Sequence, residues 1–206
     1  MCHSLFGVTT LDVVRANKFV GDALGRDPSQ MNVTVIGGHA GTTILPILSE
    51  FPELTEEQIE ALTHRIQFGG DEVRAFAAAA WLLPKGSSAP VADPLHCWMA
   101  RSWLQVVQAK NSLGSATLSM AFAGARFATS LADALNGATG VTECAFVESD
   151  KVDGCAFFST RVSLGKDGVD TIHDVPQLSA FEQQGLEAMK GDLAKQIQKG
   201  VDFVKA

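Results

Sequence analysis

Two spacings of hydrophobic residues run along the chain, and together they predict a protein of mixed helices and strands. Apolar residues three or four positions apart predict helices over 11–24, 55–69, 109–135 and 179–204. Short apolar runs bounded by turn residues predict strands or extended segments at 31–36, 42–48, 141–148, 156–164 and 169–173. The last two strands flank Gly165-Lys166-Asp167-Gly168, which is typical of a hairpin turn. This order of elements predicts an α+β domain.

Capping residues mark the ends of several predicted helices. Gly25 follows the first helix, where glycine readily takes the left-handed backbone of a helix end. Thr55 with Gln58, and Ser179 with Glu182, have the spacing of capping boxes at the starts of two others. These local signals indicate helix ends without reference to the rest of the fold.

Composition narrows the function classes. The 206 residues include 16 basic and 23 acidic side chains, for a net charge of -7, and no basic stripe, so nucleic acid is not expected as a partner. No apolar run approaches the roughly 20 residues of a membrane span, and no membrane partner is expected. The four cysteines show no Cys-x-x-Cys spacing, so neither a zinc site nor a disulfide framework is expected. The first four residues are not typical of a targeting peptide.

Three residues could form a proton-transfer site. Asp12 and Arg15 are three positions apart and share a helix face, and His39 ends an apolar run and enters a glycine-rich turn. An imidazole held by a carboxylate beside an arginine suits an acidic substrate. Spacing alone does not distinguish such a site from two commoner arrangements, a solvated ion pair on a helix and a histidine in a turn or core.

The amino-acid sequences around these three residues are more specific than the spacing of the residues. Thr9-Thr10-Leu11-Asp12-Val13-Val14-Arg15-Ala16, followed by Gly37-Gly38-His39-Ala40-Gly41, closely resembles the NAD-dependent malate dehydrogenases of the lactate/malate dehydrogenase family. Three more segments continue the resemblance in the same order, at 43–49, 114–121 and 140–147. The resemblance covers about residues 5–73 and 108–206.

The resemblance implies the carboxy-terminal catalytic domain of such an enzyme over residues 1–206. The implied reaction is the reversible oxidation of (S)-malate to oxaloacetate with NAD. His39 would be the acid and base, Asp12 would hold its other ring nitrogen, and Arg15 would bind a substrate carboxylate. Met120 matches a position that touches the nicotinamide end of the cofactor, although its spacing alone favours simple core packing. The resemblance also implies a homodimer, and an organelle (mitochondrion, peroxisome or plastid) rather than the cytoplasm.

Part of the family pattern is missing. No segment supplies Gly-x-Gly-x-x-Gly after a strand, and the family's mobile loop with two further substrate arginines has no counterpart. We therefore expect a chain that lacks the Rossmann NAD-binding domain and binds NAD weakly or not at all by itself. Two alternatives stay open. One is a catalytically inactive fragment that acts as a dimerisation or binding module, and the other is a dehydrogenase for another 2-hydroxy acid.

Residues 74–107 form an atypical insertion in this pattern. All three tryptophans and three of the seven prolines lie in this segment. Joining Asp71-Glu72-Val73 to Gln108-Ala109-Lys110 restores a smooth family-like sequence, so we interpret the segment as translated intervening sequence or a gene-model artefact. A loop or lid insertion is the simpler alternative, but unstructured insertions longer than about 15 residues are uncommon in compact domains. An amphipathic membrane or partner helix is disfavoured, because the apolar run is short and lacks flanking basic residues.

Overall fold

The computed structural model describes the backbone of residues 5–82 and 118–205, and side chains for 5–69 and 118–205. The chain divides into two compact units, Met1–Gln67 with Phe122–Ala206, and Phe68–Ala121. The sheet and its core belong to the first unit, and each unit is described by itself. Residues 83–107 of the predicted insertion lie outside the described residues.

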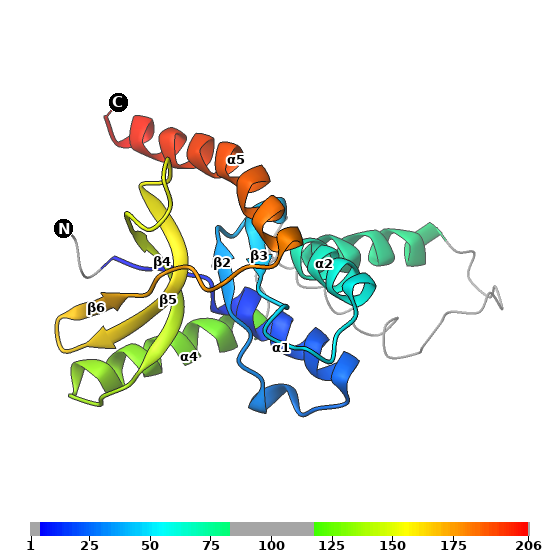
Figure 1. The fold of residues 1–206 in the computed structure, drawn as a ribbon, viewed down its shortest axis with the longest axis horizontal. Helices are drawn as coiled ribbons and strands as arrows, with labels where there is room; N and C mark the ends of the chain where they lie inside the picture. The colour runs from blue at the N-terminus through cyan, green and yellow to red at the C-terminus, as the bar shows by residue number, and fades with distance from the viewer. Residues whose placement is uncertain (1–4, 83–117, 206) are drawn as a thin grey trace. The chain divides into compact units, whose positions relative to one another are not determined.

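Helices and strands follow one another in a mixed order (Figure 1). In chain order they are β1 (Gly7–Val8), α1 (Thr10–Leu24), η1 (Pro28–Gln30), β2 (Val35–Gly37), η2 (Gly41–Thr43), β3 (Ile44–Pro46), α2 (Glu56–Leu82), α4 (Leu118–Leu135), β4 (Thr142–Glu148), β5 (Phe157–Gly165), β6 (Gly168–Ile172) and α5 (Ala180–Lys205). The α+β class predicted from the sequence is confirmed.

One sheet organises the first unit. Its six described strands run in the order β1-β4-β5-β2-β3, with β6 paired to β5, and each of these pairings is antiparallel. The β2–β3 hairpin joins the rest of the sheet where Gly37 pairs with Ser159 of β5. His39 follows two residues later, so this junction fixes where the glycine-rich turn leaves the sheet.

Three clusters of buried side chains form the core of this unit. One packs α1 against β2 and β3, the second packs α5 against the same hairpin, and the third packs α4 against β4 and β5. Val35 belongs to the first cluster and Ile36 to the second, so β2 is buried on both faces. Burial on both faces explains why this strand has a continuous apolar run instead of an alternating one.

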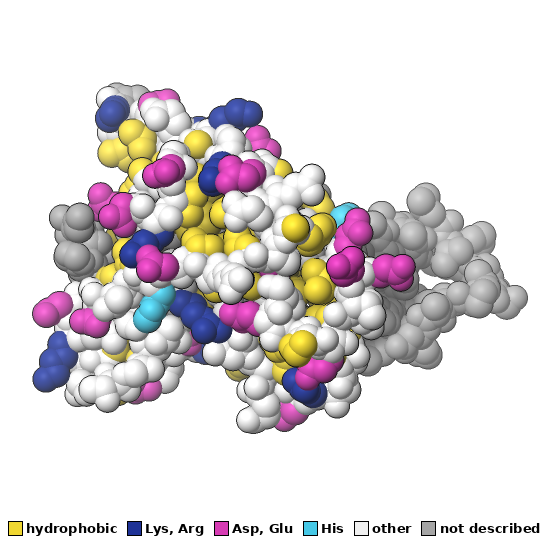
Figure 2. Space-filling view, in the orientation of Figure 1, with side chains coloured by type: hydrophobic (Ala, Val, Ile, Leu, Met, Phe, Trp, Pro, Cys, Tyr) yellow, Lys and Arg dark blue, Asp and Glu magenta, His cyan; other side chains and the backbone are white. Residues whose placement is uncertain are grey.

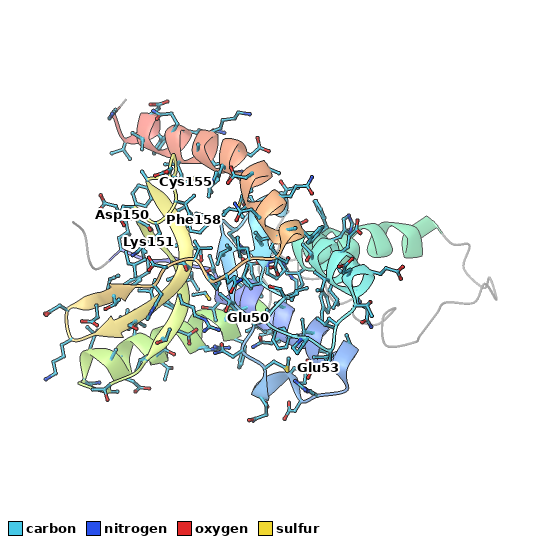
Figure 3. All side chains as sticks on the ribbon, viewed as in Figure 1. Glu50, Glu53, Asp150, Lys151, Cys155 and Phe158 are labelled. Carbon is cyan, nitrogen blue, oxygen red and sulfur yellow. The ribbon has the colours of Figure 1, made fainter. Side chains whose placement is uncertain are left out.

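The two described cysteines lie in different clusters. Cys144 is buried in the cluster of α1, and Cys155 is buried in the cluster of α5. Cys155 and Phe158 lie on the side of the sheet toward α5 (Figure 3). Burial raises the pKa of both thiols, so both are protonated at neutral pH.

The capping signals in the sequence are confirmed at three helices. Gly25 ends α1 with φ 64°, in the left-handed region. The side chain of Gln58 accepts from the Thr55 N–H at 2.9 Å, and that of Glu182 accepts from the Ser179 N–H at 2.8 Å. Both pairs therefore form capping boxes, since the hydroxyls of Thr55 and Ser179 accept in return.

The structure differs from the sequence prediction at several element ends, and most clearly at α2 and β1. The sequence predicts that the second helix ends near Gly69, but α2 continues to Leu82. The residues beyond Gly69 include Ala77-Ala78-Ala79-Ala80, which favour helix strongly, and Pro84 is the first proline after them. The sequence does not predict the edge strand β1, because two residues are too short to show a period.

The described surface carries charges of both signs. Acidic and basic side chains are interspersed over the face shown in Figure 2. Exposed ion pairs such as Lys18–Asp22 and Arg26–Glu53 contribute to this mixture. No helix in the described part of the chain is both long and apolar enough to cross a membrane.

Candidate active site

Asp12 is fully buried in the first turn of α1, with 0% of its surface exposed. The free N–H groups and the positive end of the helix dipole favour a carboxylate at this position. Thr9, just before the helix, donates its hydroxyl to the Cys144 carbonyl at 3.0 Å and lies 3.0 Å from the Ser159 hydroxyl. These contacts attach the start of α1 to β4 and β5, and so fix the position of Asp12.

His39 lies in the turn between β2 and β3. Gly37, with φ 100°, requires the left-handed backbone that glycine allows. The turn is then held by Thr43, whose carbonyl accepts from the Gly38 N–H at 2.8 Å and whose hydroxyl accepts from the Ala40 N–H at 3.1 Å. Both neighbours of His39 are therefore fixed by one residue.

Asp12 and His39 form a hydrogen-bonded pair. The Oδ2 atom of Asp12 lies 2.5 Å from the Nδ1 atom of His39. This hydrogen bond raises the pKa of His39 above its ordinary value, while partial burial and the charge of Arg15 oppose the rise. The side chain of His39 is 52% exposed, so the rest of the ring, including Nε2, can reach a bound molecule.

Arg15 contacts the other oxygen of the same carboxylate. Its Nη1 lies 3.3 Å from Oδ1 of Asp12 and donates to the backbone carbonyl of Ile66 at 3.0 Å. Both contacts use Nη1, so among the described residues Nε and Nη2 stay open to a second acceptor. These two nitrogens form the fork that grips a carboxylate with two parallel hydrogen bonds.

An apolar hollow of about 910 Å³ opens beside His39. Its walls come from β1, from the turn of His39 and from the end of α5, and they include Val8, Phe146, Leu193 and Ile197. Because His39 lines this hollow, the imidazole meets apolar walls on one side and the buried Asp12 on the other. The arrangement can pass a proton to or from a molecule bound in this hollow.

A second hollow, of about 370 Å³, is lined by charged side chains among apolar ones. Its charges are already paired within the protein, since Arg126 contacts Glu143 at 3.3 Å and Arg161 lies 3.8 Å from Glu50. These pairs make this hollow a weaker candidate for chemistry than the His39 site.

Three of the four residues singled out by the sequence come together. Asp12 touches both Arg15 and His39, although these residues come from a helix and a turn 24 or more positions apart in the chain. Met120 is half-buried in the first turn of α4. It belongs to the second unit, so only its position within α4 is given. The functional role assigned to each residue stays a prediction.

Sequence reasoning missed two parts of the site. It did not find the Ile66 carbonyl that holds Arg15, because a backbone acceptor leaves no mark in the sequence. It also missed the hollow, whose walls combine β1 with the end of α5, nearly 200 positions away. The apolar spacing at the end of α5 was the one signal available.

Comparison with protein families gives a match over most of the chain. The matching model describes the lactate/malate dehydrogenase alpha/beta C-terminal domain, over residues 9–83 and 101–204. Residues 84–100, which the model leaves unmatched, lie within the segment interpreted as an insertion.

Curated relatives match nearly the whole chain. They include a mitochondrial malate dehydrogenase of Schizosaccharomyces pombe, 46% identical over 97% of this chain and 50% of the relative. A mitochondrial malate dehydrogenase of Homo sapiens is 42% identical over 98% of this chain and 51% of the relative. A glyoxysomal malate dehydrogenase of Cucumis sativus is 44% identical over 98% and 48%. The chain spans about half the length of these relatives.

Solved structures share the fold. The malate dehydrogenase of Picrophilus torridus superposes with a TM-score of 0.65 at 17% identity, covering 100% of this chain and 56% of that one. The malate dehydrogenase of Salinibacter ruber gives 0.64 at 16% identity, covering 100% and 57%. At these identities the likeness concerns the fold alone.

Proposed function

The chain belongs to the lactate/malate dehydrogenase family, and from this we propose that Asp12, Arg15 and His39 are the substrate-binding and proton-transfer residues of a malate dehydrogenase. The proposed reaction is the reversible oxidation of (S)-malate to oxaloacetate with NAD. One observation carries the proposal: a single buried carboxylate holds an imidazole through one oxygen and an arginine through the other, beside an apolar hollow.

His39 is proposed to move the proton. Asp12 holds Nδ1, which fixes the ring orientation and leaves Nε2 for the substrate oxygen. In malate oxidation Nε2 takes the hydroxyl proton, and in oxaloacetate reduction it returns a proton to the ketone oxygen. The raised pKa of His39 favours the imidazolium, so reduction should be faster on the acid side of this pKa and oxidation on the alkaline side.

Arg15 is proposed to bind a substrate carboxylate. Its contacts with Asp12 and with the Ile66 carbonyl both use Nη1, which orients the rest of the guanidinium. The side chain is 19% exposed, so its charge is poorly screened by water. A lysine cannot reproduce two parallel hydrogen bonds, and for that reason Arg15→Lys is a sharp test.

The described residues fit NAD in part. The apolar walls beside His39, including Val8, Phe146 and Leu193, suit the flat nicotinamide ring. Lys205 is the one lysine or arginine among the described residues lining this hollow. When bound, NAD would supply the hydride acceptor for the carbon that carries the hydroxyl group. We propose that residues of this chain meet the nicotinamide end of the cofactor, with Met120 a further candidate for that contact.

Assembly and location complete the proposal. We propose a homodimer, which rests on family membership, and an organelle as the compartment. Relatives named mitochondrial, glyoxysomal and peroxisomal support the organelle. We further propose that residues 1–206 form one carboxy-terminal catalytic domain, interrupted by an insertion at about 74–107.

Oxidation of NADH in the presence of oxaloacetate tests the proposed reaction. We expect His39→Ala to lower turnover by about 10²–10⁴-fold in the protein that carries this chain with its cofactor domain. Arg15→Lys should raise the KM for oxaloacetate far more than the KM for NADH. Arg26→Lys is the matched control, because Arg26 makes an exposed ion pair with Glu53 away from the site.

Three outcomes would contradict parts of this proposal. Equal damage to both KM values by Arg15→Lys would refute its role in substrate binding. Faster reduction of pyruvate than of oxaloacetate would favour another 2-hydroxy-acid dehydrogenase. Micromolar NAD affinity of the isolated chain, measured by calorimetry, would show that residues 1–206 suffice for cofactor binding.

A binding module is the second candidate function. Phe203 and Val204 near the end of α5 are 84% and 83% exposed, and Val204 lines the hollow of His39. Exposed apolar patches of this kind mark binding surfaces. Co-purification of this chain with an intact malate dehydrogenase subunit, without NADH oxidation in the presence of oxaloacetate, would favour this candidate.

A further inference from the structure

A second buried carboxylate lies at the start of α5. Glu182 is 0% exposed, and each of its oxygens accepts two hydrogen bonds. Oε1 accepts from the backbone N–H groups of Leu48 and Ser49 at 2.8 and 2.9 Å. Oε2 accepts from the Ser49 hydroxyl at 2.6 Å and from the Ser179 N–H at 2.8 Å. One side chain therefore ties the start of α5 to the chain just after β3.

The capping box of α5 accounts for one of these four bonds. The bond from the Ser179 N–H is the local one, within three residues. The other three come from Leu48 and Ser49, more than 130 positions earlier in the chain. A helix cap does not need these three bonds, so they indicate that Glu182 also holds the segment that follows β3 against α5.

The same helix face continues to the turn of His39. Leu186, Met189 and Leu193 follow Glu182 at positions four, seven and eleven residues later, which places them on one stripe. All three are buried against the β2–β3 hairpin. A β-carbon at Gly37 would lie 2.6 Å from the Met189 sulfur, and one at Gly38 would lie 2.9 Å from Leu193. The turn of His39 thus rests directly on this stripe.

We propose that Glu182 is a positioning residue for His39. It fixes α5 against the exit of β3, and the same stripe of α5 then fixes the turn that carries His39 opposite Asp12. The catalytic meaning of this inference rests on the function proposed above. Its structural content is separate: loosening the Glu182 contacts displaces the imidazole from the carboxylate.

The chemistry requires a carboxylate at this position. Four N–H or O–H donors converge on the two oxygens of Glu182. A glutamine would replace one acceptor oxygen with an NH₂ group, which cannot accept from a backbone N–H, although the Ser49 hydroxyl could turn and accept from it. Glu182→Gln therefore keeps the size of the side chain and loses at least one of its three bonds from backbone N–H groups.

The test is an NMR titration of the histidine resonances in the whole chain, with His39 assigned by comparison with His39→Gln. We expect the pKa of His39 in Glu182→Gln to fall toward its ordinary value of 6.5, because the hydrogen bond to Asp12 is the main cause of its rise. Glu187→Gln is the matched control. It changes an exposed glutamate on the same helix, which pairs with Lys190, and it should leave the pKa unchanged.

A second variant keeps the test decisive if Glu182→Gln does not fold. Ser49→Ala removes the 2.6 Å bond to Glu182 and leaves the capping box of α5 intact, and it should lower the pKa of His39 by a smaller amount. An unchanged pKa of His39 in folded Ser49→Ala or folded Glu182→Gln would overturn the proposal and leave Glu182 a purely stabilising residue. The titration requires no turnover, so an absence of dehydrogenase activity would refute the proposed function without touching this result.

Discussion

Asp12 and Glu182 are both carboxylates with 0% exposure, yet their surroundings differ in kind. Asp12 is satisfied by two side chains, one of which, His39, can gain or lose a proton and is 52% exposed beside a hollow. Glu182 is satisfied by backbone N–H groups and a hydroxyl, none of which changes charge near neutral pH. The first arrangement suits chemistry, and the second suits structure.

Burial alone therefore does not identify a functional carboxylate. Each of these carboxylates loses its hydrating water on folding and gains hydrogen bonds within the protein in its place, as a buried charge must. What differs is whether the partners can exchange protons with a bound molecule. Substitution of Asp12 should therefore mainly affect activity, and substitution of Glu182 should mainly affect stability.

Asp12→Asn should have the largest effect, and it should be on activity. An amide cannot stabilise the imidazolium, and it can hold the ring in the wrong tautomer, so we expect turnover to fall roughly 10⁴-fold. Steady-state oxaloacetate reduction, the activity proposed above, measures the loss, with Asp22→Asn as the control on the exposed face of α1. A fall of less than tenfold would show that Asp12 does not stabilise the imidazolium during turnover.

Glu182→Gln should mainly lower stability. Hydrogen bonds from Ser49 and Ser179 together outweigh burial, which by itself would raise the pKa of Glu182, and hold that pKa below its ordinary value of 4.5. The stabilisation is therefore present above pH 4.5 and is lost as pH falls through the folded-state pKa. We expect the variant to lose about 2–3 kcal/mol of unfolding free energy at pH 7, and less below pH 4.

Urea unfolding of wild type and variant, at pH 7 and at a pH below 4, measures this loss of unfolding free energy. Glu187→Gln, on the exposed side of α5, should change the free energy of unfolding by less than about 0.5 kcal/mol at either pH. A loss by Glu182→Gln that stays the same size at both pH values would contradict the assigned ionisation.

His39→Gln should give the smallest effect on stability, with a pH dependence of the opposite sign. The pKa of His39 is raised above 6.5, so its pair with Asp12 stabilises the fold fully below pH 6.5 and loses this effect as pH rises through the folded-state pKa. Because the imidazole is half exposed, solvent screening limits the effect to about 1 kcal/mol or less. The difference in urea midpoint between wild type and variant should shrink from pH 6 to pH 9.

The sequence was most informative where local rules govern the structure. The ends of α1 and the two capping boxes were predicted because each depends on residues within a few positions of one another. The length of α2 beyond Gly69 was not, because Gly69-Gly70 favours a helix end locally, yet the helix continues to Leu82. The strand β1 has two residues and is defined by its partner β4, which no local pattern reveals.

The same distinction between local and long-range contacts applies to the candidate site. Helical spacing could place Asp12 and Arg15 together, while the contact with His39 was expected from the family resemblance and is seen in the structure. The three long-range bonds of Glu182 could not be predicted, because backbone donors such as the Leu48 N–H exist in every sequence. The pairing of distant elements, rather than any residue type, decides those contacts.

Because Cys144 and Cys155 are buried in different core clusters, each thiol can report when its own cluster opens. Cys144 lies with α1 and Cys155 with α5, and both thiols are protonated and buried while their cluster is intact. An alkylating reagent can reach either sulfur only when the surrounding cluster opens. The labelling rate of the peptide that carries each of these cysteines therefore measures how often its cluster opens. Footprinting would then tell whether the helix that carries Asp12 or the helix that carries Glu182 detaches first.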